Sequence, residues 1–221
     1  MGNVVAAYTY VKPEGYFSCP RTELLPLVPS TASRVLDIGC GEGEFARSLR
    51  AARQSSRLEI VGIELCEGPA QLAAGVLDKV IVGNVEQLDL PYEEYFDCVI
   101  LADVLEHLID PWRMVSRVKR FLRRNGHVVA SIPNVQHWVV LAGLMIGNWE
   151  YCDFGVMDRT HLRFFTGKSI NSLFKSNGFE LRYMKPRIES GRARIAHLAT
   201  AGLADPFLAR QYFLVASRKD E

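Results

Sequence analysis

Short apolar runs alternate with amphipathic stretches along most of the chain. Runs bounded by polar or glycine-rich segments predict strands at residues 35–38, 60–63, 80–82, 98–102 and 128–132. These runs are continuously apolar, as expected for strands that are covered on both faces of a parallel sheet. Two later apolar segments, 179–184 and 212–216, are placed to close the same sheet. Strands that alternate with helices in this way are typical of α/β folds.

Helices are predicted between the strands. Residues 114–122 repeat apolar side chains at helical spacing, after the cap and first turn Asp110-Pro111 and before the stop Asn125-Gly126. A further helix is expected after a Thr166 cap, and the segment 186–210 is interpreted as a helical excursion. The pattern predicts a doubly wound, mostly parallel α/β sheet of seven strands in one domain, residues 1–221.

Composition and charge narrow the possible classes. Hydrophobic residues make up 48% of the chain, which suits a globular core rather than disorder. Lys and Arg total 26 against 25 Asp and Glu, so no nucleic-acid partner is expected. The five cysteines are odd in number and contain no Cys-x-x-Cys pair, which argues against a disulfide framework or a zinc ribbon and favours a cytoplasmic protein.

No segment indicates export or membrane insertion. Residues 1–20 lack the basic start and the apolar run of a secretory signal. The longest apolar run, 138–146, falls well short of the roughly 20 residues that a spanning helix needs. We therefore expect no stable membrane insertion, and we expect this run to form a buried helix or part of an apolar pocket wall.

The strongest local signal is a glycine loop between the first predicted strand and the next helix. It reads Gly39-Cys40-Gly41-Glu42-Gly43. Glycines at such a turn let a ligand approach the backbone closely, and the helix start points free N–H groups at it. The spacing matches the dinucleotide fingerprint Gly-x-Gly-x-x-Gly only in part, so the loop alone leaves the ligand open.

Two carboxylates at strand ends separate the possible ligands. Asp37 ends the first apolar run and Glu64 ends the second, positions where a solvated surface charge is not expected. Asp37 would disfavour a pyrophosphate, whereas a ligand with an ammonium and a sulfonium would benefit from its charge. Glu64 can accept hydrogen bonds from ribose hydroxyls in either kind of nucleoside site.

Four ordered motifs carry a family resemblance. They are the segments 35–43 (VLDIGCGEG), 60–64 (IVGIE), 83–91 (GNVEQLDLP) and 95–108 (YFDCVILADVLEHL). In these segments the chain resembles the class I S-adenosylmethionine-dependent methyltransferases. The resemblance implies a Rossmann-like methyltransferase fold with an N-terminal cap at 1–33, a cofactor-binding core at 34–132, a substrate-side cover at 134–165 and the C-terminal part of the sheet at 166–221.

The resemblance also implies S-adenosylmethionine as the cofactor and assigns residues to it. Asp37 would reach the methionine ammonium, and Glu64 would bind the ribose. Asn84 would read the adenine edge, although many relatives have Asp at this position; an amide oxygen can still accept from the adenine amino group. The residues assigned to the cofactor are Asp37, Gly39, Cys40, Gly41, Glu64, Leu65, Asn84, Val85, Ala102 and Asp103.

A second resemblance concerns the acceptor. Residues 131–138 (SIPNVQHW) and 157–166 (MDRTHLRFFT) look like a bacterial methyltransferase branch that is often linked to surface-glycan biosynthesis, within a wider family that includes quinone O-methyltransferases. This resemblance implies a small-molecule or sugar acceptor, with oxygen as the expected acceptor atom. The oligomeric state stays open.

Transfer to a hydroxyl usually needs a base, and histidine titrates in the useful range. The catalytic candidates are His107, just beyond the fourth strand, then His137 and His161. Each can instead be a structural histidine, and Asp158, Arg159 and His161 can instead hold the cover together by ion pairs. No His, Cys and carboxylate set has a recognisable ligand spacing, so no metal site is expected.

Other assignments remain open at this point. The main alternatives are an oxidoreductase that uses a nicotinamide dinucleotide, and a binding module that keeps the fold without catalysis. Aromatic residues before the first strand can cover the ligand, but packing against the sheet is the default expectation; they are Tyr8, Tyr10, Tyr16 and Phe17. Trp138, Trp149 and Tyr151 are interpreted as an acceptor wall, with a core role equally open for Trp138.

Overall fold

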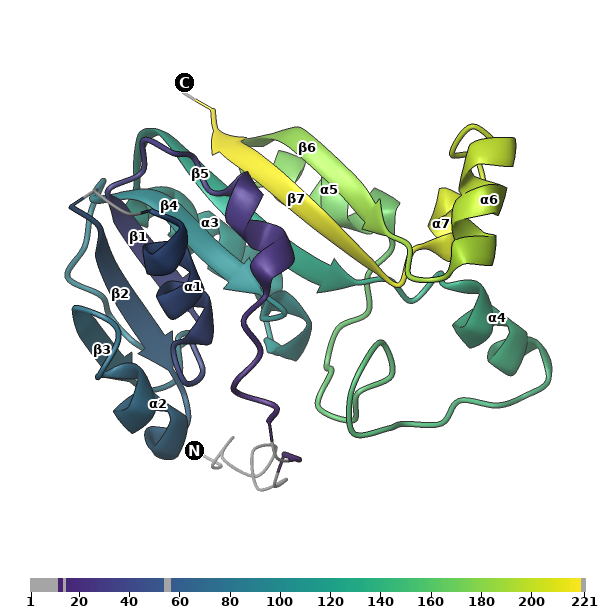
Figure 1. Cartoon of the computed structure of the whole chain (residues 1–221), viewed down its shortest axis with the longest axis horizontal. Helices are drawn as coiled ribbons and strands as arrows, with labels where there is room; N and C mark the ends of the chain where they lie inside the picture. The colour runs from purple at the N-terminus through teal and green to yellow at the C-terminus, as the bar shows by residue number, and fades with distance from the viewer. Residues whose placement is uncertain (1–11, 14, 54–56, 220–221) are drawn as a thin grey trace.

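One twisted sheet of seven strands runs through the molecule (Figure 1). The computed structural model describes residues 12–13, 15–53 and 57–219. The strands are β1 Arg34–Ile38, β2 Glu59–Glu64, β3 Lys79–Val82, β4 Phe96–Ala102, β5 Leu122–Pro133, β6 Phe179–Arg187 and β7 Gln211–Arg218. Their order is β3-β2-β1-β4-β5-β7-β6, and only β7 runs antiparallel to its neighbours. The predicted strands and the mostly parallel α/β class are confirmed.

The strand order reverses between β1 and β4. From β1 the chain continues outward to β2 and β3, and it then returns to place β4 on the other side of β1. Loops at the carboxyl ends of these two strands leave in opposite directions, which opens a crevice there. Ligands of open α/β sheets bind at this switch point.

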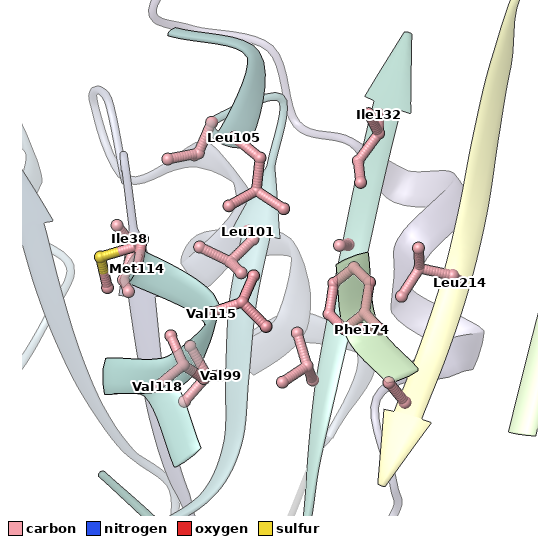
Figure 2. Packing of buried hydrophobic residues seen from close by; sticks show 14 of the residues in the cluster. Ile38, Val99, Leu101, Leu105, Met114, Val115, Val118, Ile132, Phe174 and Leu214 are labelled. Atoms are coloured by element: carbon pink, nitrogen blue, oxygen red, sulfur yellow. The ribbon is translucent and has the colours of Figure 1, made fainter. Parts of the chain in front are cut away.

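Helices cover both faces of the sheet. On one face lie the 3₁₀ helix η2 Thr22–Leu27 and α1 Glu44–Ala52; on the other lie α3 Pro111–Phe121 and α5 Gly167–Ser176. Successive residues of β1 therefore alternate between two buried clusters, Val35 facing one and Leu36 the other. Figure 2 shows part of the cluster that contains Leu36. Helix α3 contributes Val115 to it, α5 contributes Phe174 and β4 contributes Leu101. A short helix, α2 Glu67–Ala73, contacts β2 and β3.

The end of α3 differs from the prediction. The helix stops at Phe121, and Leu122 already has extended backbone angles of φ −76° and ψ 132°. Leu122 pairs with Phe96 of β4, so sheet pairing takes over from the helix four residues before the expected stop. Asn125 has φ 58°, and it lies where the register between β4 and β5 shifts. The Asn125-Gly126 pair therefore turns the strand instead of ending the helix.

A group of helices lies beyond one end of the sheet (Figure 1). Helix α4 Trp138–Met145 lies at the same end of the molecule as α6 Gly191–Ala199 and α7 Asp205–Leu208 (Figure 1). The two later helices confirm the predicted excursion within 186–210. The prediction of a buried helix at 138–146 is wrong: α4 has no buried residue, and Met145 is 87% exposed. Across the described ranges, no helix has both the length and the apolarity needed to cross a bilayer.

Candidate functional site

A cavity of about 450 Å³ opens at the carboxyl ends of β1, β2 and β4. It lies at the switch point of the strand order. Every residue that the sequence assigned to a cofactor lines this cavity. These residues are Asp37, Gly39, Cys40, Gly41, Glu64, Leu65, Asn84, Val85, Ala102 and Asp103. We call it the first cavity.

The glycine loop forms one wall of the first cavity and needs its glycines. Gly41 has φ 55°, and a Cβ added there would lie 2.4 Å from the carbonyl oxygen of Phe17. Gly39 has φ 73°, and a Cβ added there would lie 2.9 Å from Cγ2 of Val104. The backbone of residue 17 is thus packed directly on the loop, and a side chain at Gly41 would displace it.

Asp37 places an unsatisfied carboxylate oxygen at this cavity. The side chain is 2% exposed, and within the described chain its Oδ2 has no hydrogen-bond partner. Burial, and then the nearby carboxylate of Glu64, raise the pKa of Asp37 to about 7. A buried carboxylate without a donor is costly, so this oxygen fits a ligand that brings a cationic donor. An amino-acid ammonium has that chemistry.

Glu64 and Asn84 are held in place but keep free acceptor capacity. The two carboxylate oxygens of Glu64 accept the backbone N–H of Gly41 at 2.9 Å and of Cys66 at 3.0 Å. The amide oxygen of Asn84 accepts the N–H of Glu86 at 2.9 Å. Each oxygen retains a second lone pair. Ribose hydroxyls at Glu64 and an adenine amino group at Asn84 are compatible with this arrangement.

A second cavity, of about 370 Å³, adjoins the first. Tyr16, Arg21, Asp103 and His107 line both cavities. The second cavity is completed by Glu106, His161, Gln211 and other residues from the later part of the chain. The two cavities therefore share a wall, as a donor site and an acceptor site for group transfer would.

Asp103 occupies the junction in an unusual backbone conformation. Its φ of 56° lies in the left-handed region, which costs energy for a residue with a side chain. Ser131 donates a hydrogen bond to its Oδ1 at 2.7 Å, Gln211 donates another, and Arg21 forms an ion pair with Oδ2 at 2.5 Å. Residues from three separate segments thus fix this carboxylate between the cavities.

The three candidate histidines lie in different places. His107 lines both cavities, with its Nε2 3.4 Å from the hydroxyl of Tyr16 and its Nδ1 3.2 Å from the carbonyl oxygen of Thr160. Burial lowers the pKa of His107 to about 4, so its imidazole is neutral at pH 7. His161 lines only the second cavity. His137 caps α4 through the N–H of Val139 and lines neither cavity, so the structure does not bring it to the others.

Glu106 is a site residue that the sequence analysis missed. It lies on η3 Leu105–His107, is 1% exposed, and neither of its carboxylate oxygens has a hydrogen-bond partner within the described chain. Burial, and then the charge of Asp103, raise the pKa of Glu106. The available signal was its position beside His107 in an otherwise apolar segment after β4. A carboxylate there is not a surface charge.

The N-terminal aromatic residues are closer to the site than expected. Tyr16 and Phe17 line the first cavity, as the alternative to simple packing against the sheet predicted for them. Tyr16 is placed by Lys12, whose ammonium lies 4.0 Å above its ring and 2.6 Å from Asp158 of the cover. Tyr8 and Tyr10 lie outside the described residues.

The expected aromatic wall of the cover is not formed. Trp138, Trp149 and Tyr151 are 56%, 39% and 51% exposed, and none of them lines either cavity. The ring of Trp149 instead contacts that of Phe164, with the two centroids 5.4 Å apart. The ion pairs expected within the cover involve other partners: Asp158 pairs with Lys12, and Arg159 pairs with Asp153 at 2.7 Å.

Comparison with known proteins identifies related chains. A family model described as a methyltransferase domain matches residues 7–183. The chain is 31% identical over 108 residues to a ubiquinone biosynthesis O-methyltransferase of Acinetobacter baylyi, a match that covers 46% of this chain and 44% of the relative. It is 32% identical over 112 residues to the 27-O-demethylrifamycin SV methyltransferase of Amycolatopsis mediterranei, covering 48% and 39%. The matches span less than half the length of these curated relatives.

Among solved structures, the fold is similar to that of an S-adenosylmethionine-dependent methyltransferase from Archaeoglobus fulgidus. The TM-score is 0.64 at 19% sequence identity, and the similarity covers 90% of this chain and 91% of the other. At this identity the match concerns the fold.

Proposed function

Since the chain belongs to the methyltransferase domain family, we propose that it transfers a methyl group from S-adenosylmethionine to an oxygen atom of a small-molecule acceptor. The prediction of a class I S-adenosylmethionine-dependent methyltransferase is confirmed at the level of family and fold. The observation that carries the proposed reaction is the unpartnered carboxylate oxygen of Asp37 in the first cavity. An ammonium supplies the donor that this oxygen lacks.

The residues of the first cavity fit this cofactor. Asp37 receives the ammonium, Glu64 keeps lone pairs for the ribose hydroxyls, and Asn84 keeps one for the adenine amino group. The glycine loop supplies space along the backbone. When bound, S-adenosylmethionine supplies an electrophilic methyl group on a positively charged sulfur. The family match also favours this cofactor over the nicotinamide alternative.

We place the acceptor in the second cavity, with the reacting oxygen beside His107. This residue is the one candidate histidine among the described residues that lines both cavities, and it is neutral at pH 7. A carbonyl oxygen only accepts hydrogen bonds, so the contact with Thr160 places the ring hydrogen on Nδ1. Nε2 then carries the lone pair, which faces the Tyr16 hydroxyl at 3.4 Å, and an acceptor hydroxyl that replaces this contact can give its proton to Nε2.

Oxygen as the acceptor atom is supported by the relatives. Both curated relatives described above carry names of O-methyltransferases. A hydroxyl must lose its proton on methylation, and the Glu106, His107 and His161 side chains supply polar groups for that purpose in the second cavity. Five cysteines without disulfides, all within the described residues, support a cytoplasmic location.

Binding and turnover test this proposal separately. Calorimetric titration of the purified full chain with S-adenosylmethionine, S-adenosylhomocysteine and NADH should give micromolar binding, about −8 kcal/mol, for the first two only. A panel of catechols, other phenols and sugars, followed by release of S-adenosylhomocysteine, then identifies the acceptor class. Binding of NADH alone would refute the cofactor, and cofactor binding without turnover on any acceptor would favour a non-catalytic module.

A further inference from the structure

A chain of hydrogen bonds leads from the cover to the ring of His107. The hydroxyl oxygen of Thr160 lies 2.7 Å from Oδ1 of Asp158 and 3.1 Å from Nδ1 of His107. Nζ of Lys12 lies 2.8 Å from the same hydroxyl oxygen and 2.6 Å from Oδ2 of Asp158. Lys12 precedes the first strand, His107 ends η3, and the other two residues belong to the cover. We call these four residues the His107 array.

The neighbours of the Thr160 hydroxyl fix the direction of each of its hydrogen bonds. A carboxylate only accepts and an ammonium only donates. The hydroxyl therefore donates its hydrogen to Asp158 and accepts one from Lys12. Its remaining lone pair faces Nδ1 of His107, and the carbonyl oxygen of Thr160 lies 3.2 Å from the same nitrogen. Because both of these oxygens are acceptors, Nδ1 carries the ring hydrogen and Nε2 carries the lone pair.

The ion pair at the base of the array is buried. The side chains of Lys12 and Asp158 are 10% and 2% exposed, and Asp158 also accepts the backbone N–H of Thr160 at 2.8 Å. Taking two charges out of water is costly, and an apolar pair of similar size is often at least as stable. What this ion pair does provide is direction. Without it, the Thr160 hydroxyl would be free to rotate and to donate its hydrogen to the ring of His107.

We propose that Asp158 and Thr160 are positioning residues that hold His107 in the tautomer with a free Nε2, and that Lys12 keeps Asp158 in place for this role. The inference deepens the proposed function and rests on it for its catalytic meaning. Nε2 takes the proton of the acceptor hydroxyl, whose oxygen forms the bond to the methyl carbon with its own electron pair. The carbon–sulfur pair stays on sulfur, and His107 afterwards releases the proton to solvent. The Nδ1 hydrogen remains donated to Thr160 throughout.

The two charges of the array act on His107 with opposite signs. The ionisable and polar side chains described around this ring include Lys12, Tyr16, Glu106, Asp158, Thr160 and His161. Burial is the largest cause of the lowered pKa of His107, followed by the charge of His161. Lys12 lowers this pKa as well, whereas Asp158 raises it. Removal of the Lys12 charge should therefore raise the pKa of His107, and simultaneous removal of the Asp158 charge should reverse part of that rise.

The tautomer can be measured without cofactor or acceptor. Nuclear magnetic resonance of the full chain with ¹⁵N-labelled histidine shows which ring nitrogen carries the hydrogen, and His107→Gln assigns the signals. We expect hydrogen on Nδ1 of His107 at pH 7. Thr160→Val should introduce the tautomer with hydrogen on Nε2, and Thr160→Ser, which keeps the hydroxyl, should not. Hydrogen on Nε2 in the unmodified chain, or one tautomer in all three chains, would overturn the proposal.

Charge variants separate a positioning role from a merely structural one. Lys12→Met should shift the pKa of His107 upward in the same spectra, and the double variant Lys12→Met/Asp158→Asn should show a smaller shift. His127, on β5 outside both cavities, is the internal reference, and its signals should not move. If Lys12→Met does not fold, the double variant, which leaves neither charge unpaired, decides through the tautomer. An unchanged His107 in the folded variants would refute the role of the ion pair.

Turnover provides a second readout once an acceptor is known. Thr160→Val should lower kcat by about 10-fold, in the range expected for one lost hydrogen bond, with little change in the acceptor KM. Thr160→Ser should recover most of this loss. S-Adenosylmethionine affinity should be equal in both variants, because neither changes Asp37 or Glu64. A kcat in Thr160→Val equal to that of the unmodified chain would contradict the inference.

Failure of this inference is distinguishable from failure of the proposed function. If the tautomer and the pKa of His107 respond as expected but no acceptor is methylated, the array stands and the proposed function fails. If methyl transfer proceeds at one kcat in Thr160→Val and Thr160→Ser, with hydrogen on Nδ1 of His107 in both, the proposed function stands and the inference fails.

Discussion

The two cavities each contain a buried carboxylate with an unpartnered oxygen, but their surroundings differ. Around Asp37 the fixed groups are the glycine loop and the carboxylate of Glu64, which is itself satisfied by two backbone N–H groups. Around Glu106 they are the imidazoles of His107 and His161, each with its Nδ1 near a backbone carbonyl oxygen. Asp37 thus faces mainly backbone groups, whereas Glu106 faces two polar side chains.

This difference indicates which kind of ligand each cavity takes. An ammonium brings directional N–H donors and satisfies one carboxylate, as at Asp37. Two imidazoles beside a buried carboxyl group instead suit a neutral polar ligand, such as a hydroxyl compound, that can exchange a proton with them. Two buried carboxylates with unpartnered oxygens thus do not indicate the same ligand, because the groups that face them differ.

The largest expected effect lies on the acceptor side. His107→Gln should lower turnover by about 100-fold or more, the range expected for loss of a group that activates the acceptor proton. S-Adenosylmethionine affinity should stay unchanged, because Asp37 and Glu64 are untouched. Steady-state kinetics and calorimetry check the two values, with His127→Gln as the control. Equal losses of turnover and cofactor affinity would make His107 a structural residue common to both cavities.

Asp37→Asn tests the cofactor side. We expect S-adenosylmethionine affinity to fall by about 10- to 100-fold, because a hydrogen bond to a charged group contributes about 1.5–3 kcal/mol. Glu42→Gln is the matched control, since Glu42 belongs to the same loop and does not line the cavity. Normal affinity in Asp37→Asn would remove the observation on which the proposed function rests.

The pH dependence of cofactor binding separates the two carboxylates further. Because burial beside Glu64 raises the pKa of Asp37 to about 7, its charged form is scarce at pH 6 and predominant at pH 7.5. Affinity for S-adenosylmethionine should therefore rise by about 8-fold between these values, with proton release on binding. Calorimetry in buffers of different ionisation enthalpy measures both quantities. A pH-independent affinity, or the same dependence in Asp37→Asn, would contradict this assignment.

The same pKa shift has a consequence for stability. A carboxyl with a raised pKa in the folded state stabilises the fold below its unfolded pKa of about 4 and loses this contribution as the pH rises through 7. The free energy of unfolding of the cofactor-free chain should thus be higher for Asp37→Asn than for the unmodified chain at pH 8. Urea denaturation at pH 8 measures it; a less stable variant would show that Asp37 has an unseen partner.

The smallest effect is expected at the junction of the cavities. Tyr16→Phe removes a hydroxyl that lies 3.4 Å from Nε2 of His107 and keeps the ring in contact with Phe17, whose centroid is 5.1 Å away. Loss of one such hydrogen bond should lower kcat/KM by about 2- to 10-fold, without a change in cofactor affinity. Kinetics with saturating cofactor measures it, and a loss comparable to that of His107→Gln would give Tyr16 a catalytic role.

Most of the residues predicted to bind the cofactor lie in short segments at the ends of strands, and the sequence alone predicted them. Asp37 lies near the end of one strand, the glycine loop follows that strand directly, and Glu64 ends the next, so strand periodicity and adjacency are enough to place them at one edge of a parallel sheet. The motif resemblance added Asn84 and Asp103, and all of these residues line the first cavity. Their role in binding stays a prediction until the titrations are made.

The acceptor side could not be predicted in the same way. His161 reaches Glu106 only because the cover folds back onto η3, and Gln211 reaches Asp103 only because β7 lies next to β5. Periodicity does not report such contacts. The exposure of α4 was also not predictable. An apolar run predicts that a helix is buried, but it does not identify the element that would cover the helix.

The sequence by itself determined the α/β class and the strand positions, and it predicted which residues line the first cavity, because these features depend on neighbours within one strand and its following loop. Only the tertiary structure decided where α3 ends, which histidines approach the shared wall, and that Glu106 lies between them without a hydrogen bond. Those features depend on segments that are distant in the chain and are brought together by backbone pairing. The physical reason is that local hydrophobic patterns indicate which residues are buried, whereas the tertiary structure determines which groups lie next to a buried residue.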